Sequence, residues 1–168
     1  MAKYKIGDYV LYGFSGSCQV VEIGSLPFGG PDKIYYSLKP VYDARSTIYV
    51  PVDREDEIIR KVITKKEAEK ILTEITSVLP AECAFEREAC EQVLKSGDNV
   101  EVSKVIKQLR IMRKENRKNH KGLNISEERI LRDAERIFFS EIATAFDMSM
   151  EDTMAEFSEK LDPAKSKT

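Results

Sequence analysis

The sequence has little of what several classes of protein need. It contains three cysteines with no CxxC spacing, a single histidine and no tryptophan. An odd number of cysteines at such spacings argues against a disulfide framework and against a zinc site. No apolar run approaches the roughly 20 residues that a membrane span needs. The N-terminal MAKYKIGDYV also lacks the apolar core of a secretion signal. We therefore predict a cytoplasmic protein with reduced, packed thiols.

Catalytic motifs are missing as well. The sequence has no GxSxG, no P-loop, no HExxH and no GxGxxG following a strand. His120 has neither a second histidine nor a placed carboxylate beside it. Its neighbours Lys118 and Lys121 favour a solvated or phosphate-touching imidazole over a catalytic one. The sequence predicts neither an enzyme nor a metal or cofactor site.

Charge is unevenly distributed along a chain whose net charge is only −2. Residues 1–63 are neutral, residues 64–124 carry a net charge of +3, and residues 125–168 carry a net charge of −5. Such asymmetry often marks a surface that binds polyanions.

The first 63 residues have the patterns of short strands. Turn residues separate five apolar segments: GDYVLY, SCQVVEI, KIYYSLKPV, STIYVPV and EIIRKVI. Five short strands at this spacing predict a small β-barrel, whose limited core we expect to pack against the next domain. Pro51 cannot donate a ladder hydrogen bond, which favours an edge position for the strand that contains it.

From Thr64 the periodicity becomes helical, and the fold class is therefore α+β. Four polar residues occupy N-cap positions with an acid three residues later: Thr64, Asp98, Asn124 and Ser149. Pro80 suits a first turn, and Gly97 and Gly122 suit helix ends. We predict helices over 65–78, 81–95, 99–118, 125–146 and 149–161. The domains are then a β-barrel over 1–63, a helical bundle over 64–161 and a flexible tail over 162–168.

One predicted helix has a strongly basic face. Between residues 104 and 121, eight basic side chains accompany one acid, Glu115, and the eight fall within about half of the helix circumference. They are Lys104, Lys107, Arg110, Arg113, Lys114, Arg117, Lys118 and Lys121. A solvated charged face is the simpler interpretation, but such faces usually pair opposite charges. We therefore predict phosphate contact. Arg129, Arg132 and Arg136, opposite the apolar stripe of the next helix, extend this surface.

Tyrosines are confined to the β-domain, and two of them are predicted to face outward. The alternation of residues places Tyr35 and Tyr49 opposite the aliphatic sets of their strands. Exposed aromatic side chains on a small barrel often mark a protein-binding face. A partner strand could also pair with the edge near Pro51.

Two stretches resemble a known family. GDYVLYGFSG with VVEI, followed by YYSLKPVYDARSTIYVPVDRED, resembles the N-terminal domain of the CarD/CdnL family of RNA-polymerase-binding regulators, which transcription-repair coupling factors share. LKSGDNVEVSKVIKQLR and ISEERILRDAERIFFSEIATAF resemble the helical domain of that family. The resemblance covers residues 4–147. It implies a Tudor-like, SH3-like barrel that binds the polymerase β subunit and helices that contact promoter DNA, where a tryptophan wedge holds the DNA open.

This sequence departs from the family at both sites. The wedge position falls on Cys83, and the basic residues that follow it are replaced by Phe85 and Glu86. Phe85 is either a substitute wedge or a core residue. The basic residue that some members use against polymerase is Tyr49 here, with Arg45 nearby.

The hypotheses are therefore two. In the first, the barrel binds the polymerase β subunit through Arg45, Tyr49, Tyr35 and Pro51, and the basic helix, with Phe85 and Arg129, contacts promoter DNA and modulates open-complex stability. In the second, the protein is an adaptor that uses the same barrel on polymerase or another partner and does not contact DNA.

Overall fold

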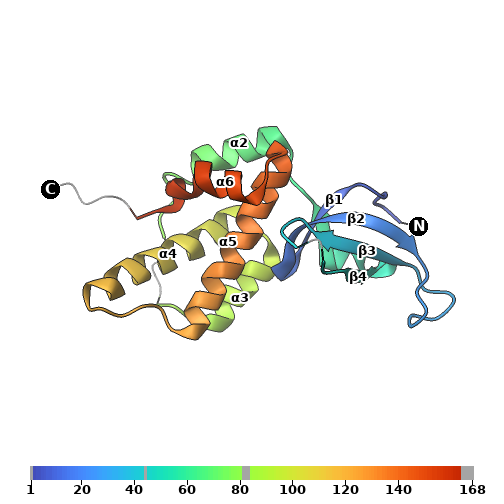
Figure 1. The fold of residues 1–168 in the computed structure, drawn as a ribbon, viewed down its shortest axis with the longest axis horizontal. Coiled ribbons are helices and arrows are strands. Elements are labelled where there is room, and N and C mark those ends of the chain that lie inside the picture. Colours follow the sequence, from blue (N-terminus) through green and yellow to red (C-terminus); the bar gives the residue numbers. More distant parts are fainter. Residues whose placement is uncertain (1, 44, 81–83, 164–168) are drawn as a thin grey trace.

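The computed structural model describes residues 2–43, 45–80 and 84–163 of the chain. An N-terminal curled antiparallel sheet lies at one end of an elongated molecule, and the helices form the other end (Figure 1). This arrangement confirms the α+β class, with a half-barrel followed by helices. In the part of the chain that the structure describes, no helix has the length and apolar character to span a membrane.

Five strands form one antiparallel sheet in the order β4-β3-β2-β1-β5. They are β1 (Tyr9–Tyr12), β2 (Gly16–Gly24), β3 (Tyr35–Pro40), β4 (Ile48–Pro51) and β5 (Ile59–Lys61). Four of them lie within a predicted segment, and β2 extends the predicted segment over residues 17–23 by one residue at each end. A register shift between Val20 and Glu22 bends β2 and helps the sheet to curl. Alternate residues such as Val20, Leu38 and Val50 fill the inner face and are buried.

Short helical turns join some of these strands. Gly13, Ser15 and Gly16 predict the turn between the first two strands, but the sequence did not predict the helical segment before β5. The turns are η1 (Gly13–Ser15) between β1 and β2, and η2 (Val52–Arg54) with α1 (Glu55–Ile58) between β4 and β5. The last predicted strand is the apolar segment over residues 57–63, whereas β5 covers only Ile59–Lys61. The three acids in the first turn of α1 favour a helix there because they interact well with the positive end of the helix dipole.

The second half of the chain is helical. Its elements are α2 (Lys65–Glu74), α3 (Arg87–Ser96), α4 (Asn99–Lys118), α5 (Ile125–Phe146), α6 (Met150–Phe157) and the turn η3 (Ser158–Leu161). All four predicted N-cap side chains accept a hydrogen bond from the backbone N–H three residues later. The predicted starts at 65, 99 and 125 are thereby confirmed.

Several predictions about helix ends were wrong. The helix predicted over 149–161 begins at Met150 and ends at Phe157, where the turn η3 follows. The helix that follows Pro80 begins at Arg87, although its predicted start at residue 81 lies outside the described residues. The helix predicted over 65–78 ends at Glu74. The predicted end of α4 at Lys118 is confirmed, but Gly122 is not its cap, because the cap is Asn119 and the left-handed residue is His120. Gly97, by contrast, caps α3 with φ +66° as expected.

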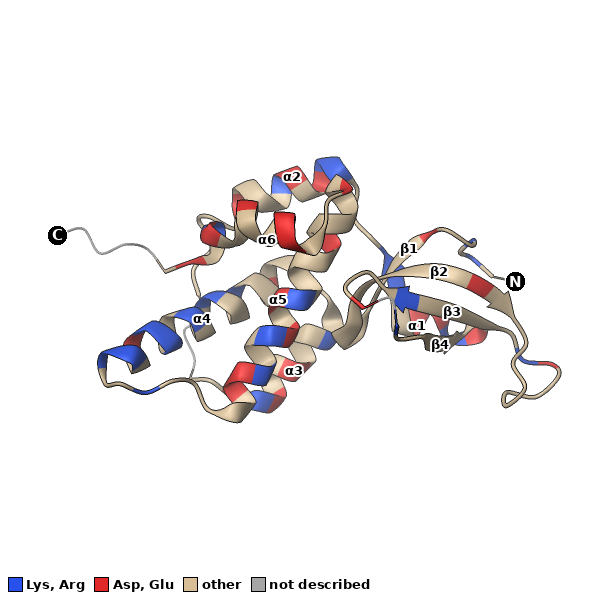
Figure 2. Cartoon of the chain, in the orientation of Figure 1, with Lys and Arg blue, Asp and Glu red and all other residues tan. Residues whose placement is uncertain are grey.

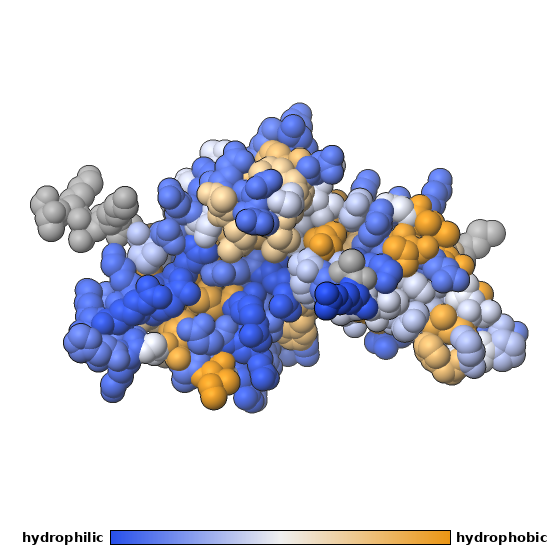
Figure 3. All heavy atoms as spheres, in the orientation of Figure 1, coloured by the Kyte–Doolittle hydropathy of each residue, from blue (hydrophilic) through white to orange (hydrophobic). Residues whose placement is uncertain are grey.

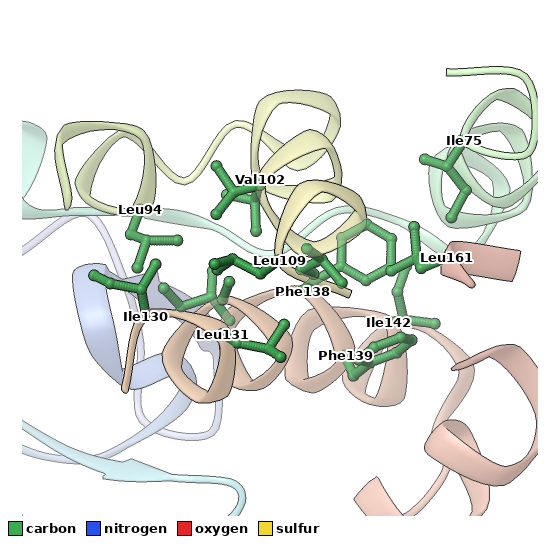
Figure 4. Packing of buried hydrophobic residues seen from close by; sticks show 14 of the residues in the cluster. Ile75, Leu94, Val102, Leu109, Ile130, Leu131, Phe138, Phe139, Ile142 and Leu161 are labelled. Atoms are coloured by element: carbon green, nitrogen blue, oxygen red, sulfur yellow. The ribbon is translucent and has the colours of Figure 1, made fainter. Parts of the chain in front are cut away.

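The helical core is arranged around α5. Its apolar side chains, including Ile130, Phe138 and Ile142, contact side chains from α2, α3, α4 and η3 (Figure 4). Phe138 and Phe139 are fully buried and pack edge to face at 5.1 Å. This confirms that the apolar stripe of residues 125–146 is core. Cys90 is also buried as predicted, whereas Cys83 lies outside the described residues.

The sheet packs directly on the helical domain. In β1, Val10 faces the core of the sheet, whereas the adjacent Leu11 belongs to the helical core. Gly16, at the start of β2, lies against the backbone of α5 with no room for a Cβ atom. The expected packing between domains is therefore present, and β1 is buried on both faces.

Candidate functional site

One of the two edges of the sheet is formed by β5, and the other by β4. Its inner edge pairs with β3, and no other strand in the described ranges pairs with its outer edge. Val52 donates to the carbonyl of Ile34 at 2.9 Å, and Val50 lies opposite Tyr36. Because hydrogen-bonded pairs alternate along an antiparallel ladder, the backbone groups of Tyr49 and Pro51 point away from the sheet. The predicted edge position of Pro51 is confirmed.

An aromatic patch lies beside this edge. Tyr35 and Tyr49 are on the outer face, as predicted, and Phe28 from the loop between β2 and β3 covers both rings at 6.2 and 5.4 Å. Phe28 is 69% exposed and Tyr49 is 44% exposed. Gly29 brings the loop against the ring of Tyr35, where a larger residue would clash. Apolar surface gathers at this end of the sheet in Figure 3.

The turn before β4 presents Arg45 to solvent. Asp43 accepts hydrogen bonds from the hydroxyl of Ser46 at 2.6 Å and from the backbone N–H of Arg45 at 3.1 Å. These hydrogen bonds lower the pKa of Asp43 and keep it ionised. Arg45 itself is exposed. The turn is therefore fixed by a carboxylate while its arginine remains available to a partner.

Two of the eight predicted cations do not face solvent. Lys107 is buried, and its Nζ donates to the carbonyls of Ile75, at the end of α2, and of Val78, the latter at 2.6 Å. Burial lowers the pKa of Lys107. Its ammonium donates to two carbonyls just beyond the C-terminus of α2. The prediction that Lys107 contacts DNA is therefore wrong.

Arg110 is also a structural residue, and the prediction that it contacts DNA is wrong. Its side chain is 4% exposed and forms ion pairs with Glu135 of α5 at 3.1 Å and with Asp162 at 2.9 Å. It also donates to the carbonyl and the hydroxyl of Ser158 at 2.7 and 2.9 Å. These contacts hold the C-terminal turn η3 against α4 and α5.

Most of the remaining cations gather at the C-terminal end of α4, which is rich in blue in Figure 2, whereas Lys104 lies near the start of the helix. Arg113, Lys114 and Arg117 have no ion pair within the described part of the chain. Lys104 pairs with Glu101 at 3.0 Å and Lys118 with Glu115 at 3.2 Å, both at exposed positions. Exposed pairs of this kind are weak and leave a cation able to exchange its partner. We call Arg113, Lys114, Arg117 and Lys118 the cationic end.

The start of α5 lies next to this end. Two hydrogen bonds fold back the loop between α4 and α5. The N–H of Lys121 donates to the carbonyl of Asn116 at 2.9 Å, and the side-chain amide of Asn116 donates to the carbonyl of Gly122 at 3.1 Å. Ile125 is 84% exposed, and Arg129, one turn later, is exposed as well. His120 is exposed.

Of the two predicted roles for Phe85, the structure supports that of a core residue. It precedes α3 and is partly buried against the helical core. The family wedge position, Cys83, lies outside the described residues. Among the residues that are described, no group of three His, Cys, Asp or Glu side chains is placed to hold a metal ion.

Sequence reasoning missed Phe28, Arg60 and Glu141. The loop of Phe28 is dense in glycine and proline, which predicts turns but not the face on which an apolar residue lies. Arg60 and Glu141 form a bidentate ion pair between the domains, 81 positions apart in the sequence. No local pattern signals such a pair.

Comparison with protein families agrees with this architecture. Residues 4–63 match the family model of the CarD-like/TRCF RID domain, and residues 67–158 match that of the CarD C-terminal domain. The two matches follow in the order of the half-barrel and the helices. The chain therefore belongs to the CarD-like family, whose members are non-enzymatic transcription factors that interact with RNA polymerase.

Proposed function

We propose that the protein is a bacterial, cytoplasmic transcription regulator that binds the β subunit of RNA polymerase and modulates the stability of promoter open complexes. The observation that carries the proposal is the free edge of β4 beside the aromatic patch, in a chain of this family. An extended segment of the partner would pair with the outward backbone groups of Tyr49 and the carbonyl of Pro51. Tyr35, Tyr49 and Phe28 supply apolar contact, and Arg45 supplies charge.

Binding of Tyr49→Ala to a β-lobe fragment tests the polymerase contact. Removing a ring at the centre of an interface typically costs about 2 kcal/mol, so we expect affinity to fall by at least about tenfold. Ile6→Ala is the matched control, because Ile6 is also exposed but lies outside the patch. Calorimetric titration gives the affinity. Absence of wild-type binding at micromolar concentration would refute the proposal.

The DNA contact is proposed for the cationic end together with Arg129. Support comes from the exposure of Lys114, Arg117, Lys118 and Arg129, from the partial exposure of Arg113, and from the lack of an ion pair for Arg113 and Arg117 in the described part of the chain. The variant Arg113→Glu with Arg117→Glu should shorten open-complex lifetime. The protein's effect on open complexes should also become less sensitive to salt. Its slope against the logarithm of salt concentration should fall by about two, since each phosphate contact contributes about one. The matched control is Lys66→Glu with Lys70→Glu, which makes the same change of charge on α2, away from the cationic end.

A second candidate function is a protein-only adaptor. The burial of Lys107 and Arg110 favours it, because a quarter of the eight predicted phosphate contacts is used within the fold. The absence of tryptophan removes the family wedge as well. If the charge reversal on α4 leaves both lifetime and salt dependence unchanged while polymerase binding persists, the adaptor is the correct function.

A further inference from the structure

The two domains meet at a buried ion pair that the proposed function does not use. Glu141, in α5, is 0% exposed, and its two oxygens accept hydrogen bonds from Arg60 of β5 at 2.6 and 2.8 Å. One of these oxygens also accepts from the backbone N–H of Ile63 at 3.0 Å. A buried carboxylate requires such complete pairing. Glu141 is therefore tied to the sheet and to the linker that leaves it.

Arg60 connects a further element of the helical domain. Its guanidinium donates to the carbonyl of Gly97, between α3 and α4, at 2.7 Å and to the carbonyl of Lys61 at 3.0 Å. A planar guanidinium holds its donors in fixed directions. One side chain therefore fixes the position of β5 relative to both α5 and the turn between α3 and α4.

A second set of contacts lies along β2. Ser17 donates its backbone N–H to the hydroxyl of Ser140 at 2.9 Å, and its own hydroxyl lies 2.6 Å from that of Thr144. Arg136 of α5 stacks over the ring of Tyr42 at 4.2 Å. These contacts and the Arg60–Glu141 pair hold the same helix at separate points, and the buried bidentate ion pair is the strongest of them.

We infer that Arg60 and Glu141 are a positioning pair that makes the two domains one rigid body. The β4 edge and the cationic end are then held at a fixed distance and angle. The consequence for transcription rests on the proposed function: two contacts support each other only when the geometry lets both form at once. Only Val62, Ile63 and Thr64 separate β5 from α2, so the linker leaves little slack once the pair is formed.

The rigidity can be measured on the protein alone. Spin labels at Ile6, in the β-domain, and at Glu115, at the far end of α4, report the distance between the domains when they are placed in a background that lacks the native cysteines. We expect a narrow distance distribution for the parent chain and a broad one for Glu141→Gln. Arg60→Lys, which keeps the charge but loses the planar fork, is the milder variant. Glu128→Gln, an exposed acid of the same helix, should change nothing. A broad distribution in the parent, or no change in either variant, overturns the inference.

A reversible lock tests the functional consequence. The side chains of Ser17 and Thr144 contact each other across the domain junction, with their hydroxyls 2.6 Å apart, so Ser17→Cys with Thr144→Cys is the pair chosen for oxidation to a disulfide. We expect Glu141→Gln to keep its affinity for the β-lobe fragment but to lose its effect on open-complex lifetime. The oxidised disulfide should restore that effect, and reduction should remove it again. A general loss of folding would not give this pattern.

The possible failures are distinguishable. If the lock abolishes the effect of the otherwise parental chain on open complexes, the domains must move and the inference is wrong. If the parental chain does not bind polymerase, the proposed function is wrong, and the distance measurement still decides whether the domains form one body.

Discussion

Replacing Arg110 by alanine would decide whether this side chain serves the fold or a nucleic acid. The guanidinium is almost inaccessible to solvent and contacts Glu135, Ser158 and Asp162. Alanine would leave Glu135, which is 20% exposed, and the carbonyl of Ser158 without these donors. The turn η3 would also lose its attachment to α4.

The expected loss of stability follows from the exposure of the partners. Removing one partner of a fully buried ion pair costs about 3–5 kcal/mol. Asp162 is 54% exposed, so solvent already screens that ion pair. We therefore expect about 2–3 kcal/mol for Arg110→Ala. For a chain of this size this corresponds to a fall in melting temperature of roughly 4–12 °C.

Thermal and urea unfolding of Arg110→Ala and Arg113→Ala provide the comparison. Arg113 is one turn further along α4 and has no ion pair in the described part of the chain, so its removal should change stability by no more than about 0.5 kcal/mol. Arg113→Ala should instead weaken the effect on open complexes. An Arg110→Ala protein that melts with the parental chain but loses DNA binding would show that the assignment of these residues is wrong.

Two further predictions concern the sheet and the domain junction. Burial and a hydrogen bond to Glu55 raise the pKa of Tyr36 from 10.0 to about 12, so the stability this phenol contributes is present below pH 10 and is lost as the pH rises towards 12. Urea unfolding between pH 9 and 12 should show a smaller alkaline loss for Tyr36→Phe, and parallel curves would contradict the assignment. Gly97→Ala should cost at least about 1–2 kcal/mol, because φ is +66° and a Cβ would lie 2.7 Å from Leu11. Gly122→Ala, with open space and no left-handed backbone, should change little in the same thermal assay, and equal losses would refute this reasoning.

Local signals predicted the elements of the fold well. Alternation identified β1, β3 and β4, because each has one face in a core and one towards solvent or a neighbour, and apolar segments between turn residues identified β2 and β5. The caps Asp98 and Asn124 fixed the starts of α4 and α5, because a side-chain oxygen at an N-cap satisfies a free N–H whatever surrounds it. The segment after Pro80 carried no cap, and the predicted start failed there.

The functional surfaces were less predictable because they depend on contacts between distant segments. Helical spacing placed Lys107 and Arg110 on a charged face, but it could not show that the end of α2 and the turn η3 cover that part of α4. The free cations further along α4 have the same residue types and spacing. Only tertiary packing distinguishes the two groups.

The position of Pro51 also has a consequence for self-association. The outer edge of β4 is short, and its proline lies where an N–H would otherwise point outward. If two copies paired their β4 edges symmetrically about Tyr49, each copy would lack the N–H donor at Pro51. That dimer would therefore lose two hydrogen bonds, whereas pairing with a strand of another protein loses only one. The edge therefore discriminates against its own copy while it still accepts a different chain.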